Sequence, residues 1–115
     1  MAQLTIYKPD NSIADVLIIS DSLYKELSRV ARLFELEYLN LAFIREIKRR
    51  VLVTVTTVES LDKNTLNWVI DRELKESLLK RIASKSFNWF DELLDVISCI
   101  ERLSNPHSLR ICLTK

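Results

Sequence analysis

The chain has 115 residues and contains no glycine, although average usage of roughly 7% would place about eight in this length. P-loops, Rossmann fingerprints, nucleophile elbows and EF-hand loops need glycine where the backbone turns with positive φ or approaches a ligand, so all four are excluded. The hydrophobic content of 48% excludes an extensively disordered chain. The formal net charge of +1 is far below that of a dedicated nucleic-acid module. We expect a single domain spanning residues 1–115.

The first elements in chain order are two short strands. Residues 3–7 alternate apolar and polar side chains and end at the turn-forming cluster 8–12, which predicts a strand followed by a turn. The following segment, 13–19, is ambiguous, but its apolar run Val16–Ile19 favours a second strand. Together the two strands would form a hairpin.

A long helix is predicted from Ser20 to about Arg50. Ser20 is a suitable N-cap, and apolar residues follow at steps of three and four. These residues are Leu23, Leu27, Val30, Phe34, Tyr38 and Leu41. Two alternatives stay open, because residues 34–38 also alternate in a strand-like way and the helix is able to break near Asn40.

The segment Val51–Val58 is predicted to be a strand, since it is β-branched almost throughout and alternates valine with threonine or leucine. A polar turn over Glu59–Asn64 should lead into a second amphipathic helix, which Ser84–Ser86 interrupts. The apolar stripe of that helix consists of Leu66, Ile70, Leu74, Leu78 and Ile82.

The third predicted helix, from about Phe87 to Leu103, is apolar nearly all round. Its main stripe consists of Phe90, Leu93, Ile97 and Ile100. Asn105 and Pro106 should stop it, and the apolar segment 109–113 reads as the last strand. The resulting order β(β)αβααβ predicts an α+β fold, with a small mixed sheet of three or four strands and about three helices packed on it.

Few residues are suited to catalysis or metal binding. His107 is the only histidine and follows Pro106 in a turn, and Cys112 lies in an apolar strand pattern where a thiol is inert. One histidine and two cysteines without a C-x-x-C pair do not make a zinc site. Asp91 and Asp95 lie one turn apart, but acidic residues near a helix N-terminus are explained by the helix dipole. We therefore expect a non-enzymatic protein without catalytic residues, metal or cofactor.

The cysteines and the hydropathy pattern indicate in which cellular compartment the protein is expected. Cys99 and Cys112 both stand in apolar surroundings, which favours free thiols of a cytoplasmic protein over a disulfide. The sequence has neither a signal-peptide pattern nor an apolar run of 18 residues, so we expect no membrane association.

The apolar surplus of the third helix is one of two functional signals. A helix covered on one side by a sheet needs one apolar stripe, so the surplus suggests a protein partner or a second copy of the chain. We expect a protein–protein interaction module, either a homo-oligomer or a small regulatory or inhibitory subunit. The predicted interface residues are Trp68, Trp89, Phe90 and Val96.

The second signal is a concentration of basic residues in the segment 25–50. Such residues are able to neutralise phosphates, so a nucleic-acid-binding regulator is the alternative function. They are Lys25, Arg29, Arg32, Arg45, Lys48, Arg49 and Arg50. Cations near a helix C-terminus also complement the helix dipole without any ligand, and this makes nucleic acid the less favoured partner.

Overall fold

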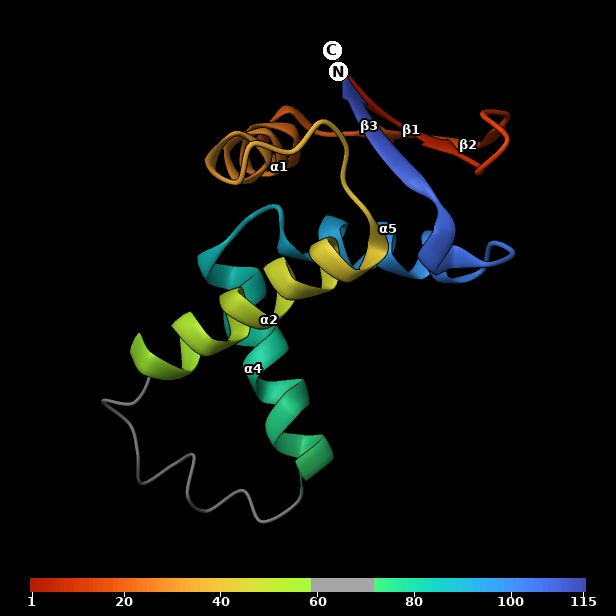
Figure 1. Ribbon diagram of the computed structural model, residues 1–115. Helices are drawn as coiled ribbons and strands as arrows, with labels where there is room; N and C mark the ends of the chain where they lie inside the picture. The colour runs from red at the N-terminus through yellow and green to blue at the C-terminus, as the bar shows by residue number, and fades with distance from the viewer. Residues whose placement is uncertain (59–71) are drawn as a thin grey trace.

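The computed structural model describes residues 1–58 and 72–115 (Figure 1). The elements in chain order are β1 (Ala2–Tyr7), β2 (Ile13–Ile19), α1 (Asp21–Leu33), α2 (Leu41–Val58), α4 (Arg72–Ser86), α5 (Phe90–Glu101), the 3-10 turn η2 (Pro106–Ser108) and β3 (Arg110–Thr114). The described residues thus form three strands and four α-helices, and the predicted α+β class is confirmed.

The three strands form one sheet in the order β2-β1-β3. Leu4 of the central strand lies opposite Leu17 of β2 and opposite Leu113 of β3, and both pairings are antiparallel. The expectation of a mixed sheet is therefore corrected for the described residues. The tight connection between β1 and β2 permits only an antiparallel pair. The two termini lie side by side because β3 returns along β1 (Figure 1).

The helices lie on one side of this sheet (Figure 1). Ala2, Leu4 and Ile6 alternate along β1 and are fully buried beneath the helices. The other face carries Ile18 and Val16 of the edge strand β2, and both are exposed. The predicted hairpin of the first two strands is confirmed, with Asn11 at φ 69° in its turn.

The start of α1 is fixed by the predicted N-cap. The Ser20 Oγ accepts a hydrogen bond from the Leu23 N–H at 3.2 Å. The backbone N–H of Ser20 donates to Glu92 Oε2 of α5 at 2.9 Å, and its hydroxyl donates to Glu92 Oε1 at 2.5 Å. One serine thus caps α1 and connects this helix to the first turn of α5.

The single helix predicted from Ser20 to about Arg50 is wrong, and the alternative break near Asn40 is what the structure has. The helix α1 ends at Leu33, and Glu35 then takes a left-handed conformation with φ 52°. Asn40 starts α2, because its Oδ1 accepts the Phe43 N–H at 2.8 Å. Between the helices, Leu39 and Ile111 of β3 exchange two backbone hydrogen bonds of 2.8 Å.

The strand predicted over Val51–Val58 is also wrong, because this segment is the second half of α2. Ile44, Ile47, Val51 and Val55 recur at steps of three, four and four and are all buried. Burial of this stripe outweighs the weak preference of valine for strands.

The remaining elements follow the prediction where they are described. The helix α4 ends at Ser86, as the interruption at Ser84–Ser86 indicated, and β3 forms at the predicted place. The turn Glu59–Asn64 and the first residues of the second amphipathic stripe, Leu66 and Ile70, lie outside the described residues. The main stripe of α5 is entirely buried, so the described elements share one hydrophobic core.

Candidate functional site

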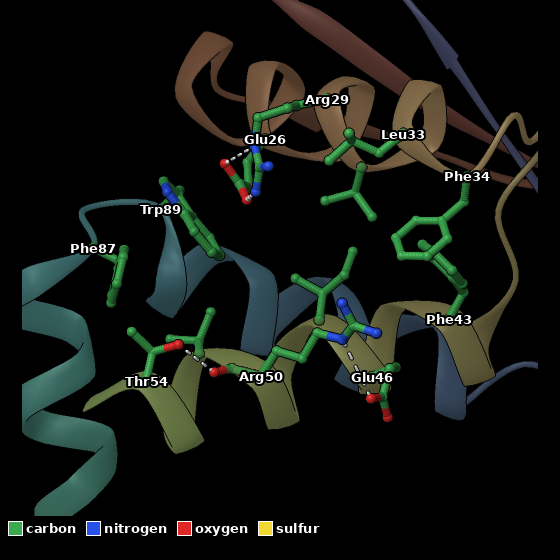
Figure 2. A pocket seen from close by; sticks show the side chains of 13 residues that line it. Glu26, Arg29, Leu33, Phe34, Phe43, Glu46, Arg50, Thr54, Phe87 and Trp89 are labelled. Atoms are coloured by element: carbon green, nitrogen blue, oxygen red, sulfur yellow. Dashed lines mark hydrogen bonds and ion pairs between the residues drawn. The ribbon is translucent and has the colours of Figure 1, made fainter. Parts of the chain in front are cut away.

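A groove lies between α1 and α2, with a volume of about 350 Å³ (Figure 2). One face of α1 forms the first wall and one face of α2 the second. Phe87 and Trp89, in the connection from α4 to α5, lie at one end. We call this cavity the α1–α2 groove.

The interior of the α1–α2 groove is apolar. Val30 of α1 and Ile47 and Val51 of α2 are buried at its base. Leu33 also lines the groove, and 65% of its surface is exposed. An apolar side chain of this size loses favourable free energy while it faces water, so a ligand that covers Leu33 gains from its burial.

Aromatic rings bound both ends of the groove (Figure 2). Phe34 and Phe43 meet edge to face, with ring centroids 5.5 Å apart. At the other end the Phe87 and Trp89 rings are tilted, with centroids 5.6 Å apart. Such pairs are rigid and offer a large contact area, which is typical of protein-binding surfaces.

The rim of the groove carries ion pairs on both walls. On α1, Arg29 Nη2 donates to Glu26 Oε1 at 2.5 Å. On α2, Arg49 Nη2 donates to Glu46 Oε1 at 2.5 Å, and the Arg50 Nε lies 3.4 Å from the same oxygen. Two arginines therefore share one carboxylate on the α2 side.

These pairs change the acidity of the rim groups. The hydrogen bond from Arg49 is the largest cause that lowers the pKa of Glu46 from its usual 4.5 to about 2, and the charges of Arg49 and Arg50 act in the same direction. The carboxylate of Glu26 raises the pKa of Arg29, chiefly through their hydrogen bond. The carboxylate of Glu46 therefore stays ionised at neutral pH, and the guanidinium of Arg29 stays charged.

The predicted protein-interface residues have separate positions in the structure. Trp89 is half-buried and lines the groove. Phe90 and Val96 are buried among the residues of the chain's own core, and this corrects the expectation that they face a partner. The apolar surplus of α5 is used inside the fold, because α1, α2 and α4 pack against this helix. Trp68 lies outside the described residues.

The predicted nucleic-acid-binding residues are divided between two helices. Arg29 and Arg50 line the groove from opposite walls, and Arg49 pairs with Glu46 beside it. Arg45 instead forms an ion pair with Glu101 of α5 at 3.4 Å. The other three are exposed or half-exposed and have no ion pair with any described residue. They are Lys25, Arg32 and Lys48.

The remaining polar candidates do not converge. Asp91 accepts a hydrogen bond from the Ser84 hydroxyl at 2.6 Å, which joins the end of α4 to the start of α5. His107 is exposed in η2, and Cys99 and Cys112 are free and half-buried. Within residues 1–58 and 72–115, no three His, Cys, Asp or Glu side chains gather in a metal-binding group.

Among the groove residues that the sequence analysis does not assign to a site are Leu33, Phe34 and Phe43. The predicted long helix places Phe34 on its apolar stripe, whereas Phe34 lies at the end of α1 and is about half exposed. The available signal was Asn40, a good N-cap with an apolar run behind it. A break there turns Phe34 and Phe43 into the facing ends of two helices.

Comparison with known proteins gives no relative for this chain. No protein-family model, no curated protein and no solved structure matches it. Among the described residues, no helix has both the length and the apolar character that crossing a membrane requires.

Proposed function

We propose that this chain is a non-enzymatic protein-interaction module, and that the α1–α2 groove binds an apolar face of a helix from a partner protein. The observation that carries the proposal is the combination of an apolar groove with an exposed edge at Leu33 and aromatic pairs at both ends. Its volume of about 350 Å³ accepts several side chains of a partner.

The walls of the groove favour a helical ligand over an extended one. Both walls are helices, whose backbone groups are already bonded within the helix. An extended peptide in the groove would leave its own N–H and C=O groups without partners, whereas a helix satisfies them internally. The α1 wall runs from Glu26 to Leu33, which is about 10 Å at 1.5 Å per residue. This length matches the spacing of helix anchors at i and i+7.

The groove also supports a protein partner over nucleic acid. The basic residues of α1 and α2 lie on either side of an apolar surface, and Arg29 and Arg49 are engaged with glutamates. A phosphate backbone gains little from contact with Leu33 and Phe34. We further propose a regulatory or adaptor role in the cytoplasm, where the free Cys99 and Cys112 stay reduced.

The test uses a synthetic amphipathic helix with leucines at i, i+3, i+4 and i+7 and uncharged glutamines elsewhere. We expect saturable amide shifts in NMR spectra of the labelled protein, clustered at residues 29–34 and 43–54. The variant Leu33→Gln should weaken binding about fivefold, because part of the leucine burial is lost. The matched control is Ile18→Gln, since Ile18 is exposed to 64% but lies on the sheet.

Three results would contradict the proposal. The first is no saturable binding of the peptide. The second is an equal loss of affinity in Leu33→Gln and Ile18→Gln. The third is a change of the amide shifts of residues 29–34 and 43–54 with protein concentration when no peptide is present. Such a change would identify a second copy of the chain as the occupant of the groove. A short DNA duplex at two salt concentrations serves as the nucleic-acid comparison.

A further inference from the structure

We infer that the α1–α2 groove selects a helix with acidic residues beside its apolar face, and that Arg50 is the residue that recognises the acid. This inference rests on the proposed function and adds the charge of the partner. It is carried by the position of Arg50 and by the distribution of charge along the two walls.

Arg50 lies at the mouth of the groove with unused hydrogen-bonding capacity (Figure 2). Its guanidinium carbon is 5.5 Å from the centre of the Phe34 ring, so the group is held over the aromatic end. Its Nε is 3.4 Å from Glu46 Oε1, a long contact, while Arg49 makes the short bonds to the same glutamate. The two Nη atoms of Arg50 have no hydrogen-bond acceptor among the described residues. They form the planar fork that binds a carboxylate with two hydrogen bonds.

The rim of α2 carries a surplus positive charge. On the α1 wall the lining Arg29 is balanced by Glu26, whereas the rim of α2 has Arg49 and Arg50 against Glu46. Each glutamate is already neutralised by a neighbouring arginine. A partner helix with lysines beside its apolar face would meet like charge at the α2 rim, whereas one with glutamates or aspartates would meet opposite charge there.

The other negative charges of this region lie at the end of the groove. Glu35 and Glu37 belong to the connection between α1 and α2, beyond the Phe34–Phe43 pair, and both are exposed there. They line a separate, smaller hollow with Tyr38 and Asn40. The electrostatic preference of the groove walls is therefore set by the arginines and not by these two acids.

The experiment compares three labelled peptides with the same leucine face. The residues that flank this face are all glutamate, all glutamine or all lysine. Fluorescence anisotropy at low salt should show that the glutamate peptide binds about three to five times more tightly than the glutamine peptide. The lysine peptide should bind most weakly. Raising the salt concentration should reduce the difference.

The variant Arg50→Gln should remove the preference for glutamate while the glutamine peptide still binds. The matched control Arg102→Gln changes an exposed arginine at the end of α5, outside the groove, and should keep the preference. Circular dichroism checks that both variants fold.

Equal affinity of the three peptides for the wild-type protein would overturn the inference and leave the proposed function standing. The same holds if Arg50→Gln and Arg102→Gln reduce the glutamate preference equally. Failure of all three peptides to bind would instead overturn the proposed function itself.

Discussion

At the scale of single residues, the absence of glycine means that other residues must adopt left-handed backbone conformations. The backbone is left-handed at three described positions, and these are occupied by Asn11 at φ 69°, Glu35 at φ 52° and Asn105 at φ 48°. Asparagine tolerates this conformation well, and the sequence indicated turns at both asparagines. Glutamate does not share this tolerance, so Glu35 is the strained position of the three.

We predict that Glu35→Gly stabilises the protein. The left-handed conformation costs a residue with a Cβ atom about 1–2 kcal/mol, and glycine avoids that cost but loses part of the gain to its greater freedom when unfolded. The net increase in the free energy of unfolding should be about 0.5–1 kcal/mol, measured by urea denaturation.

The control for this prediction is Glu37→Gly, in the same exposed connection but without positive φ. This variant should be unchanged or slightly less stable than the wild type, because glycine only adds entropy to the unfolded chain. If Glu35→Gly is no more stable than Glu37→Gly, the left-handed backbone is not what limits stability here.

At the scale of elements, β2 is an edge strand, and one of its residues hinders the addition of a further strand to the sheet. Ile13, Val16 and Ile18 are exposed along it, a composition that invites another strand to add. Asp15 interrupts the strand: it lies opposite the buried Ile6, and its Oδ1 accepts the Val16 N–H at 2.8 Å. A charge directed inward and an edge N–H already in use both discourage strand addition.

We predict that Asp15→Val causes self-association through β2. The substitution removes the charge and releases the Val16 N–H, while valine suits a strand. Light scattering coupled to size exclusion should show an apparent mass above that of the wild type, rising with protein concentration. Adding Ile18→Lys to the same variant should reverse the change, since an edge lysine opposes pairing. An Asp15→Val protein with the mass of the wild type would show that Asp15 does not protect this edge.

The error over Val51–Val58 also belongs to this scale. Val51 and Val55 are buried in α2, while Val53 between them is exposed. In the sequence, valines at 51, 53 and 55 match a period of two. Only Val51 and Val55 continue the helical steps that begin at Ile44 and Ile47, so Val53 falls on the exposed side of the helix. The eight residues 51–58 alone do not distinguish a strand period of two from a helical period. The longer segment that includes Ile44 and Ile47 does.

At the scale of the whole molecule, one core joins the sheet and the helices. Phe90 is its largest fully buried side chain, with no exposed surface. We predict that Phe90→Ala lowers the free energy of unfolding by about 3–5 kcal/mol, because it leaves a cavity among the surrounding apolar residues. Urea denaturation measures the loss.

The comparison for Phe90 is Phe34→Ala, since Phe34 is about half exposed at the end of the groove. Its loss should be less than half as large, because less of its surface is buried. Equal losses in the two variants would contradict the assignment of Phe90 to the core and of Phe34 to the surface. A smaller substitution, Phe90→Leu, keeps the measurement possible if the alanine variant does not fold.

The sequence by itself determined the α+β class, the hairpin, the Ser20 cap, the end of α4 at Ser86 and the final strand. These features depend on local signals such as alternation, capping side chains and turn residues, which act over a few positions. The buried stripe of α5 was also readable, because its helical period is regular over about three turns.

The tertiary structure alone decided where the groove lies. The groove forms because the helix breaks before Asn40, so that α1 and α2 face each other. It also requires that the apolar side chains of α5 are buried in the core and do not form the interface themselves. Each of these depends on which of several possible partners a side chain buries against, and residues far apart in the chain settle that choice. The absence of glycine therefore limits the turns, while packing between α1 and α2 makes the surface that a partner would meet.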